Sequence, residues 1–217
     1  MAAYYPAFLD LRDRPCTVIG GGALAAEKVR GLLEAGARVT VIAPVVADSL
    51  AALAEERRIV LHARPYRPGD LRGAFLAIAA GADPDTRAAI WREAGVERVV
   101  LNSVDDAAHC HFIAPAIHRR GDLVVAVSTA GKSPALAVRI RDRIADRIGP
   151  EYGALLELLG ELRSEIASRE PDFARRTALW YRLVDLDLDA DLRRGDVEGA
   201  RRRARALLDE VISSVST

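Results

Sequence analysis

A glycine-rich turn between an apolar run and a helix-forming stretch is the strongest chemical signal in the sequence. The apolar run Cys16–Ile19 ends in three glycines, and Gly20, Gly22 and Ala25 have the spacing G-x-G-x-x-(G/A). In this motif the first glycine permits a sharp turn and the second lets a pyrophosphate approach the backbone. The small third residue lets the helix pack closely on the strand. We therefore expect a bound dinucleotide; the alternative is a tight turn without a ligand.

The backbone of the turn and of the following helix start is expected to hold the pyrophosphate, since free N–H groups and the helix dipole favour an anion there. The residues concerned are Gly20, Gly21, Gly22, Ala23 and Leu24. An acidic residue about 20 positions past the glycines commonly binds the ribose hydroxyls. The corresponding stretch, residues 41–45, contains no acid. The residues alone therefore do not distinguish NAD from NADP.

Alternating apolar runs and helical stretches predict a Rossmann-like α/β domain with a parallel sheet covered on both faces. The expected strands are Cys16–Ile19, Val39–Ile42, Ile59–Ala63, Phe75–Ala80 and Val99–Asn102. Ligands bind beyond the carboxyl ends of such strands. Four candidate segments follow those ends: Gly20–Gly22, Ala43-Pro44, Ala80-Gly81 and Asn102–Asp105. We also expect Asp48 to cap the helix after the second strand.

The pattern changes after residue 112. Phe112–Ile117 and Leu123–Ser128 read as an antiparallel hairpin, and an arginine-rich helix follows the loop Ser128–Pro134. From Glu151 onward the apolar spacing is helical throughout. We predict a dinucleotide domain (1–112), a small hairpin-and-helix dimerisation unit (113–148) and an all-helical region (149–217). The middle unit is too small to bury its own core, which favours pairing with a second copy.

Two short motifs invite other chemistry. His109, Cys110 and His111 could bind Fe²⁺ or Zn²⁺, but neighbouring residues on a strand point to opposite faces, so packing or surface roles are favoured and no metal site is predicted. The run Gly131-Lys132-Ser133 suggests a P-loop. Its first glycine is replaced by Ala126, which excludes that interpretation.

Together these segments resemble the precorrin-2 dehydrogenase family, which includes the dehydrogenase–ferrochelatase module of sirohaem synthases. The resemblance covers nearly all of residues 4–148, in residues 5–11, 20–28, 35–44, 102–106, 112–116 and 128–134. It implies NAD-dependent oxidation of precorrin-2, a carboxylate-rich tetrapyrrole, to sirohydrochlorin in sirohaem biosynthesis. Some members then insert Fe²⁺ to form sirohaem. Members of the family are homodimers.

The resemblance also implies roles for individual residues. Asp105 occupies the family's catalytic position, where one carboxylate could act as general base both in oxidation and in metal insertion; the alternative is a helix or turn cap. Asn102 would orient the substrate or the nicotinamide. The backbone of Ala43, Pro44 and Val45 would line the adenosine side of the cofactor.

Substrate carboxylates are expected to meet the loop after the hairpin. Its candidate binding residues are Ser128, Thr129, Lys132 and Ser133. Arg139 and Arg143 share one face of the next helix and either bind carboxylates or form a solvated surface. The sequence departs from the family at position 107, usually proline, and at position 111, usually acidic. The exact geometry of that loop therefore does not transfer.

Composition limits the remaining function classes. The 31 basic and 31 acidic residues balance, which argues against nucleic acid or an anionic membrane as the main partner. Two cysteines give no disulfide framework, and no signal or membrane-spanning pattern occurs, so we expect a cytoplasmic protein. The alternative to an enzyme is a non-catalytic, NAD-sensing dimeric regulatory module. Such a module needs neither Asp105 nor the loop at Ser128.

Overall fold

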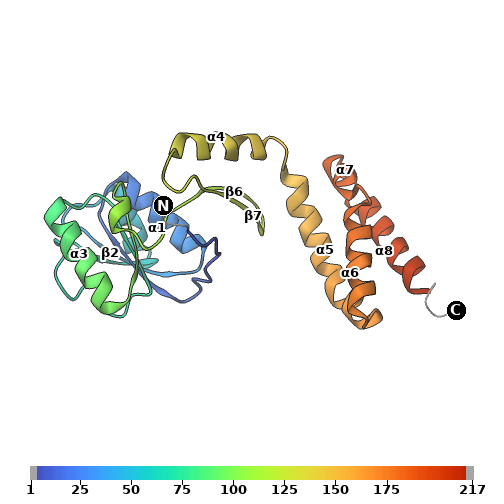
Figure 1. The fold of residues 1–217 in the computed structure, drawn as a ribbon, viewed down its shortest axis with the longest axis horizontal. Helices are drawn as coiled ribbons and strands as arrows, with labels where there is room; N and C mark the ends of the chain where they lie inside the picture. The colour runs from blue at the N-terminus through green and yellow to red at the C-terminus, as the bar shows by residue number, and fades with distance from the viewer. Residues whose placement is uncertain (1–3, 214–217) are drawn as a thin grey trace. The chain divides into compact units, whose positions relative to one another are not determined.

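The computed structural model describes residues 4–213 of the chain. These residues form two compact units, which divide between Ala114 and Pro115, and each unit is described by itself. Figure 1 shows the parallel sheet and its helices in the blue to green part of the chain, and helices dominating the yellow to red part.

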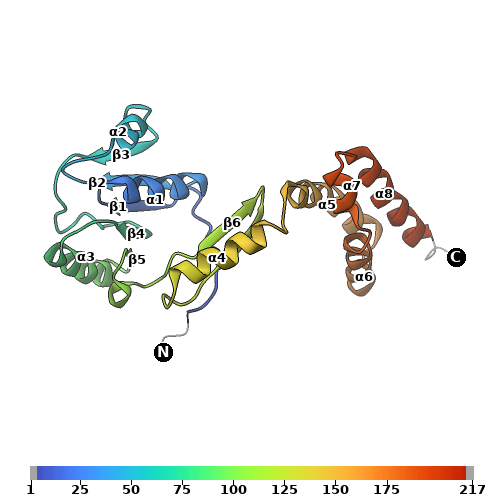
Figure 2. The same ribbon diagram turned by 90° about the horizontal axis from the view of Figure 1, so that it is seen from above.

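The first unit is built on a five-stranded parallel sheet, as the sequence predicts. Its strands are β1 (Pro15–Ile19), β2 (Arg38–Ile42), β3 (Ile59–His62), β4 (Leu76–Ala79) and β5 (Val100–Ser103). They are hydrogen-bonded in the order β3-β2-β1-β4-β5, with Val18 opposite Val41 on one side and Ile78 on the other. Since all strands run the same way, their carboxyl ends meet at one edge (Figure 2).

Helices cover the two faces of this sheet, and alternate strand residues face each of them. α1 (Ala23–Glu34) and α2 (Asp48–Glu55) pack on one face, where Val18, Val29 and Leu50 are fully buried. α3 (Pro84–Glu97) packs on the other, against Leu101 and its neighbours. These two apolar clusters form the core and fix the strand ends from which the candidate site is built.

Local capping explains where these helices begin and end, and it corrects one expectation. Asp83 caps α3 by accepting a hydrogen bond from the Thr86 backbone N–H at 3.0 Å. Gly36, at φ +77°, terminates α1 in the left-handed region that glycine tolerates. The expectation that Asp48 caps α2 is wrong. Ala47 is the cap residue, and Asp48 is already in the first turn. Its negative charge there still interacts favourably with the helix dipole.

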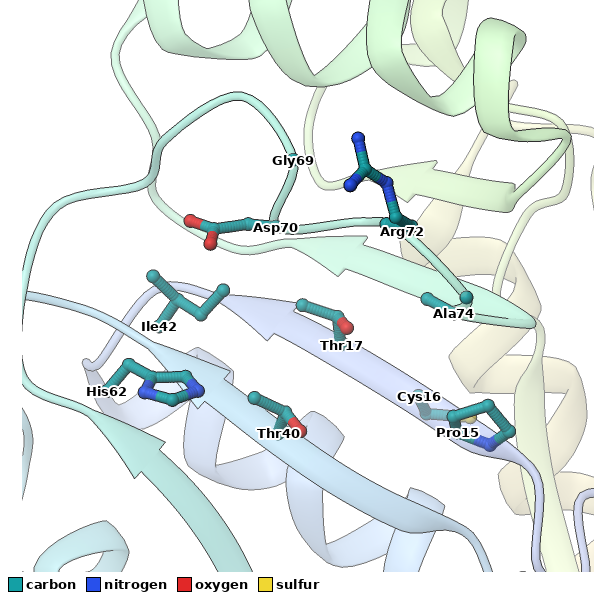
Figure 3. Close-up of a pocket in the computed structure, with 11 residues that line it drawn as sticks. Pro15, Cys16, Thr17, Thr40, Ile42, His62, Gly69, Asp70, Arg72 and Ala74 are labelled. Carbon is teal, nitrogen blue, oxygen red and sulfur yellow. The ribbon is translucent and has the colours of Figure 1, made fainter.

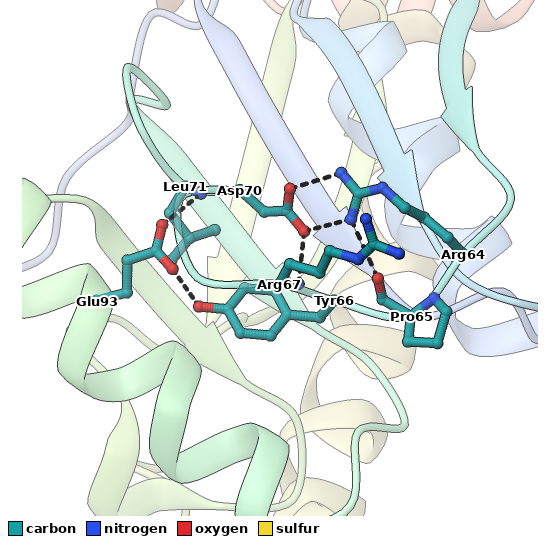
Figure 4. A network of polar contacts seen from close by, with 7 residues as sticks. All are labelled: Arg64, Pro65, Tyr66, Arg67, Asp70, Leu71 and Glu93. Atoms are coloured by element: carbon teal, nitrogen blue, oxygen red, sulfur yellow. Dashed lines mark hydrogen bonds and ion pairs between the residues drawn. The ribbon is translucent and has the colours of Figure 1, made fainter.

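The segment between β3 and β4 crosses the α3-side face of the sheet without a helix and is fixed by polar contacts (Figure 4). Arg64 and Asp70 form a two-pronged ion pair, with N–O distances of 2.8 and 2.7 Å. The Tyr66 hydroxyl donates to Glu93 on α3, whose other oxygen accepts from the Leu71 N–H at 2.7 Å. The hydrogen bond from Arg64 lowers the pKa of Asp70, and burial beside Glu93 raises the pKa of Tyr66. The segment is thereby tied to α3.

Replacing Tyr66 by phenylalanine should lower stability without changing the fold. The substitution leaves one half-buried oxygen of Glu93 unpaired, a loss of about 1–2 kcal/mol. A thermal melt should show a midpoint roughly 2–6 °C lower. The matched control is Tyr5→Phe, because the Tyr5 side chain is 91% exposed. Equal midpoints for the two variants would show that the Tyr66–Glu93 contact contributes nothing.

The second unit begins with the antiparallel hairpin that the sequence predicts, but its first strand is displaced. β6 (Ala116–Arg120) pairs with β7 (Leu123–Val127) around a two-residue turn. Residues 112–115, expected in the strand, lie outside it, while Arg119 and Arg120, expected in the turn, are paired. Pro115 has no N–H to donate to a ladder, and Gly121 supplies the positive φ, +56°, that tight hairpin turns need.

Helices complete the second unit. They are α4 (Pro134–Ala145), α5 (Pro150–Arg169), α6 (Phe173–Val184), α7 (Leu188–Arg193) and α8 (Val197–Ser213). α4 packs on the hairpin, and the buried His118 joins the hairpin to the following turn through its Nε2–H bond to the Ile148 carbonyl, at 2.9 Å. α5 to α8 share a leucine-rich core that includes Ile166, Leu183 and Leu208. No helix in the described part of the chain is both long and apolar enough to cross a membrane.

Candidate functional site

The three glycines after β1 are required for different reasons. A Cβ on Gly20, which has φ +132°, would lie 1.9 Å from the Ala80 carbonyl oxygen, and a Cβ on Gly21 would lie 2.0 Å from that of Val45. Both positions therefore allow close backbone contact between neighbouring strand ends. A Cβ on Gly22 would meet no atom within 4 Å. Gly22 alone faces open space, as expected where a ligand approaches the backbone.

The start of α1 offers free backbone donors next to that space. Gly22 is the cap residue, no side chain caps the helix, and the Gly22 carbonyl accepts from Ala26 N–H at 3.0 Å. The N–H groups of Ala23 and Leu24 therefore have no partner within the helix, and both residues are exposed. Unpaired N–H groups at the positive end of a helix dipole suit a phosphate, so the site fits a dinucleotide.

The end of β2 forms the adjacent wall without any charged side chain. Ala43 is buried, whereas Pro44 and Val45 are exposed. The Ala47 N–H donates to the Gly21 carbonyl at 2.8 Å, which fixes this wall to the glycine turn. Arg38, a basic residue that could be considered for a 2′-phosphate, begins β2 at the opposite edge, and its Nε donates to the Asp13 carbonyl at 3.0 Å.

Asp105 lies at the same edge of the sheet, in a tight turn directly after β5. The Asp106 N–H donates to the Ser103 carbonyl at 3.2 Å, and the Val104 N–H donates to Ala79 of β4 at 2.9 Å. Asp105 has φ +62°, in the left-handed region that favours glycine. Its side chain is exposed and has no hydrogen-bond or ion-pair partner among the described residues. A carboxylate held in this way is available to a ligand.

Asn102 is placed at the end of β5, as predicted, but its side chain is turned inward. It is buried, and its Nδ2 donates to the Phe112 carbonyl at 3.0 Å and to Cys110 Sγ at 3.6 Å. These bonds close the loop that carries Asp105. The predicted contact with substrate or nicotinamide stays a prediction.

His109, Cys110 and His111 each contact the same loop or the strand before it. His109 Nδ1 lies 2.8 Å from Asp106 Oδ2, and the Cys110 sulfur lies 3.2 Å from both the nitrogen and the oxygen of Ser103. His111 Nδ1 accepts from the Leu101 N–H at 3.1 Å. Burial raises the pKa of the Cys110 thiol. Within residues 4–213 no group of three or more His, Cys, Asp or Glu side chains is arranged to hold a metal ion.

The loop Ser128–Pro134 lies in the second unit, and some of its side chains already form hydrogen bonds within the loop and with the start of α4. The Thr129 hydroxyl donates to the Ser133 carbonyl at 2.9 Å, so its proton is already used. Ser133 Oγ caps α4 by accepting from Leu136 N–H at 3.3 Å. Lys132 is exposed and has no ion-pair partner among the described residues. Of the predicted carboxylate ligands in this loop, Lys132 is the charged one, and only the Thr129 hydroxyl already donates its proton within the loop.

A separate hollow of about 300 Å³ lies beneath the segment that joins β3 to β4 (Figure 3). The side chains of Thr17, Thr40 and His62 line it from the sheet, and Asp70 lines it from the segment above. None of the residues predicted for cofactor or substrate lines this hollow. The hollow lies on the same face of the sheet as α3, over the part of that face that α3 does not cover.

Three known protein families match consecutive parts of the chain. Residues 7–116 match the family described as "Putative NAD(P)-binding", which accounts for the glycine turn and the whole sheet. Residues 120–147 match "Sirohaem biosynthesis protein central", and residues 151–208 match "Sirohaem synthase dimerisation region". The chain belongs to the sirohaem synthase family. Its first unit is the NAD(P)-binding domain of that family.

Sirohaem synthases from several bacteria are similar to most of the chain. The proteins from Methylobacillus flagellatus, Photobacterium profundum and Aeromonas salmonicida are 38%, 37% and 36% identical over 203, 182 and 208 residues. These alignments cover 94%, 84% and 95% of this chain. They cover only 44%, 39% and 44% of the relatives, so the chain spans less than half of their length.

A solved structure shares the fold. The protein named "SirC, precorrin-2 dehydrogenase" aligns with a TM-score of 0.76 over 96% of this chain and 98% of its own, at 24% sequence identity. The similarity confirms the fold that the sequence predicts: a Rossmann-like sheet, a small hairpin and a helical carboxyl-terminal region.

Sequence reasoning missed the residues that fix the Asp105 loop. Asp106 pairs with His109, and His111 packs on Trp91 with ring centroids 4.6 Å apart; neither Asp106 nor Trp91 was identified as a partner from the sequence. The available signal was the concentration of His, Cys and Asp between a buried strand and Phe112. That signal indicates a loop folded back on its own strand, but it does not say which side chains contact each other.

Proposed function

We propose that the protein oxidises precorrin-2 to sirohydrochlorin with NAD⁺ as the hydride acceptor. The observation that carries this proposal is the free Asp105 carboxylate at the same sheet edge as the open Gly22 backbone. Membership of the sirohaem synthase family and a fold shared with a precorrin-2 dehydrogenase support the substrate. A purely dinucleotide-sensing module has no need of a carboxylate held in an unfavourable backbone conformation.

In the proposed reaction, each segment at the carboxyl edge of the parallel sheet has a separate role. Backbone N–H groups of Gly22, Ala23 and Leu24 bind the pyrophosphate, and Ala43 to Val45 line the adenosine side. Bound there, NAD⁺ would supply the hydride acceptor for oxidation of the tetrapyrrole. Asp105 accepts the proton that is lost from the substrate at the same time, so two electrons and two hydrogens leave the substrate in total. Because residues 41–45 contain no acid, backbone groups there would contact the ribose in place of an acidic side chain.

The loop after β7 is proposed to bind the carboxylate arms of the substrate. Lys132 supplies a charge, and the hydroxyls of Ser128 and Ser133 can still donate a proton while accepting their present hydrogen bonds. Arg139 and Arg143 are exposed on α4, without an ion-pair partner in the described part of the chain, and can add further charge. The contribution proposed for Thr129 is made through its backbone or by holding the loop, because its hydroxyl proton is committed.

Fe²⁺ insertion into sirohydrochlorin is a second proposed activity. It requires removal of the pyrrole N–H protons. Asp105, an exposed carboxylate at the carboxyl edge of the sheet with no ion-pair partner among the described residues, can accept them. Iron is here a substrate and not a resident cofactor. Anaerobic addition of Fe²⁺ to preformed sirohydrochlorin, followed by the absorbance spectrum of sirohaem, tests this activity separately.

We also propose that the protein works as a cytoplasmic homodimer with three functional parts. Residues 1–112 bind the dinucleotide, and residues 113–148 contribute to dimerisation and substrate binding. Residues 149–217 contain the whole of the matched dimerisation region, residues 151–208. The exposed side chains of Phe173, Tyr181 and Val184 along α6 are apolar surface of the kind that interfaces cover. No nucleic-acid or membrane partner is proposed.

Turnover by the purified protein tests the main proposal. Precorrin-2 and NAD⁺ are expected to yield sirohydrochlorin and NADH in equal amounts, as followed by their absorbance. A parallel reaction with NADP⁺ measures the cofactor preference. Measurable NAD⁺ binding without turnover would reject the enzyme and favour the regulatory module.

A further inference from the structure

The loop from Ser103 to Phe112 is fastened at several points, and one of its charged side chains remains free. Cys110 and His111 bind the backbone of β5, and Asn102 binds the Phe112 carbonyl. Asp106 is paired, whereas Asp105 beside it is not. These hydrogen bonds therefore fix the loop on both sides of Asp105 without involving its carboxylate.

Asp106 is the centre of a small charged network next to that residue. Its Oδ2 lies 2.8 Å from His109 Nδ1 and 4.0 Å from Nη1 of Arg87 on α3. The hydrogen bond from His109 lowers the pKa of Asp106, so the carboxylate is ionised and His109 Nδ1 carries the shared proton. The rings of His109 and Trp91 in turn form a T-shaped pair, with centroids 5.4 Å apart. Asp106 thus links the turn that contains Asp105 to α3.

We propose that Asp106, through His109, is a positioning residue that holds the Asp105 carboxylate toward the substrate. Asp105 occupies the third position of a turn closed by the Asp106 N–H, and at φ +62° it adopts a conformation that an isolated Asp rarely keeps. The Asp106 side chain anchors the last residue of this turn, directly after Asp105. It therefore limits how far the turn can relax. The inference rests on the proposed dehydrogenase activity, in which Asp105 is the base.

The role can be separated from a general contribution to folding by comparing two substitutions at the same position. Asp106→Asn keeps an oxygen that accepts the His109 N–H, whereas Asp106→Ala removes it. We expect Asp106→Ala to lower kcat for precorrin-2 oxidation by about tenfold or more, since a small misplacement of a catalytic group is costly. The dissociation constant for NAD⁺ should stay within about twofold. Asp106→Asn should restore kcat to within about threefold of the unsubstituted protein.

The controls distinguish failure of this inference from failure of the proposed function. The unsubstituted protein must turn over; if it does not, the dehydrogenase proposal fails first. Asp85→Asn, an exposed carboxylate in the first turn of α3, is the matched charge control and should leave kcat unchanged. His109→Ala breaks the same contact from the other side and replaces Asp106→Ala if that variant does not fold.

Three results would overturn the positioning role. In the first, Asp106→Ala, or His109→Ala in its place, retains kcat within about twofold. In the second, kcat and NAD⁺ affinity fall together, as general loosening of the domain predicts. In the third, Asp106→Asn is as impaired as Asp106→Ala, which would mean that charge and not the hydrogen bond matters. Loss of kcat alone, with rescue by asparagine, supports the inference.

Discussion

Asp105→Asn is expected to abolish precorrin-2 oxidation while leaving the fold and NAD⁺ binding intact. Asparagine has nearly the same shape and tolerates the left-handed region as well as aspartate does, so φ +62° is not disturbed. What it lacks is the ability to accept a proton. Loss of a general base typically costs about a hundredfold to ten-thousandfold in rate. kcat should fall by that factor.

Two accompanying measurements make the Asp105 result specific. NAD⁺ titration and the thermal midpoint should match those of the unsubstituted protein, because the described residues make no hydrogen bond or ion pair with the Asp105 side chain. Asp105→Gly relieves the backbone and should melt at the same temperature or slightly higher, yet be equally inactive. Substantial turnover by either variant would remove Asp105 from the mechanism.

Substitutions in the glycine turn should separate folding from cofactor binding. Gly21→Ala places a methyl group 2.0 Å from the Val45 carbonyl oxygen, a backbone atom that cannot move alone. We expect a loss of about 3–5 kcal/mol in the free energy of unfolding of the first unit. Gly20→Ala adds an unfavourable φ to the same kind of clash and should be at least as severe. Chemical denaturation followed by circular dichroism measures both losses.

Gly22→Ala is the internal control of this series. Its Cβ meets nothing within 4 Å, and the residue is outside the left-handed region, so the variant should fold with near-normal stability. The added methyl group instead occupies space through which the pyrophosphate approaches. NAD⁺ affinity should therefore fall by at least about tenfold. Normal affinity in Gly22→Ala would place the dinucleotide elsewhere.

The fold was predictable from the sequence where one local preference determined it. The strand–glycine–helix transition at Gly20 follows from backbone conformations that glycine adopts easily. Errors occurred where two preferences compete. Asp48 is a good cap residue, but the chain enters α2 one residue earlier, at Ala47. Arg119 and Arg120 were expected between the two strands, but the tighter turn at Gly121 and Asp122 leaves both arginines paired in β6.

The position of the candidate base was predictable, but its surroundings were not. Parallel strands put the residues after β5 at the ligand edge, which is sufficient to single out Asp105. Its positive φ and the contacts of Cys110 and His111 depend on a chain that folds back over the preceding strand. Side-chain contacts of this kind have no periodic signal in the sequence. The internal use of the Thr129 hydroxyl was hidden for the same reason.

The interlocked glycines also affect how the protein responds to its ligand. Gly20 touches Ala80, and Gly21 touches Val45, so the turn reaches its final shape only when the ends of β1, β2 and β4 are all in place. The cradle is thus preorganised, and little ordering entropy remains to be lost on binding. By mass action, bound dinucleotide stabilises every strand on which the cradle depends. The supply of dinucleotide therefore affects the stability of the whole first unit against unfolding, and not that of one loop alone.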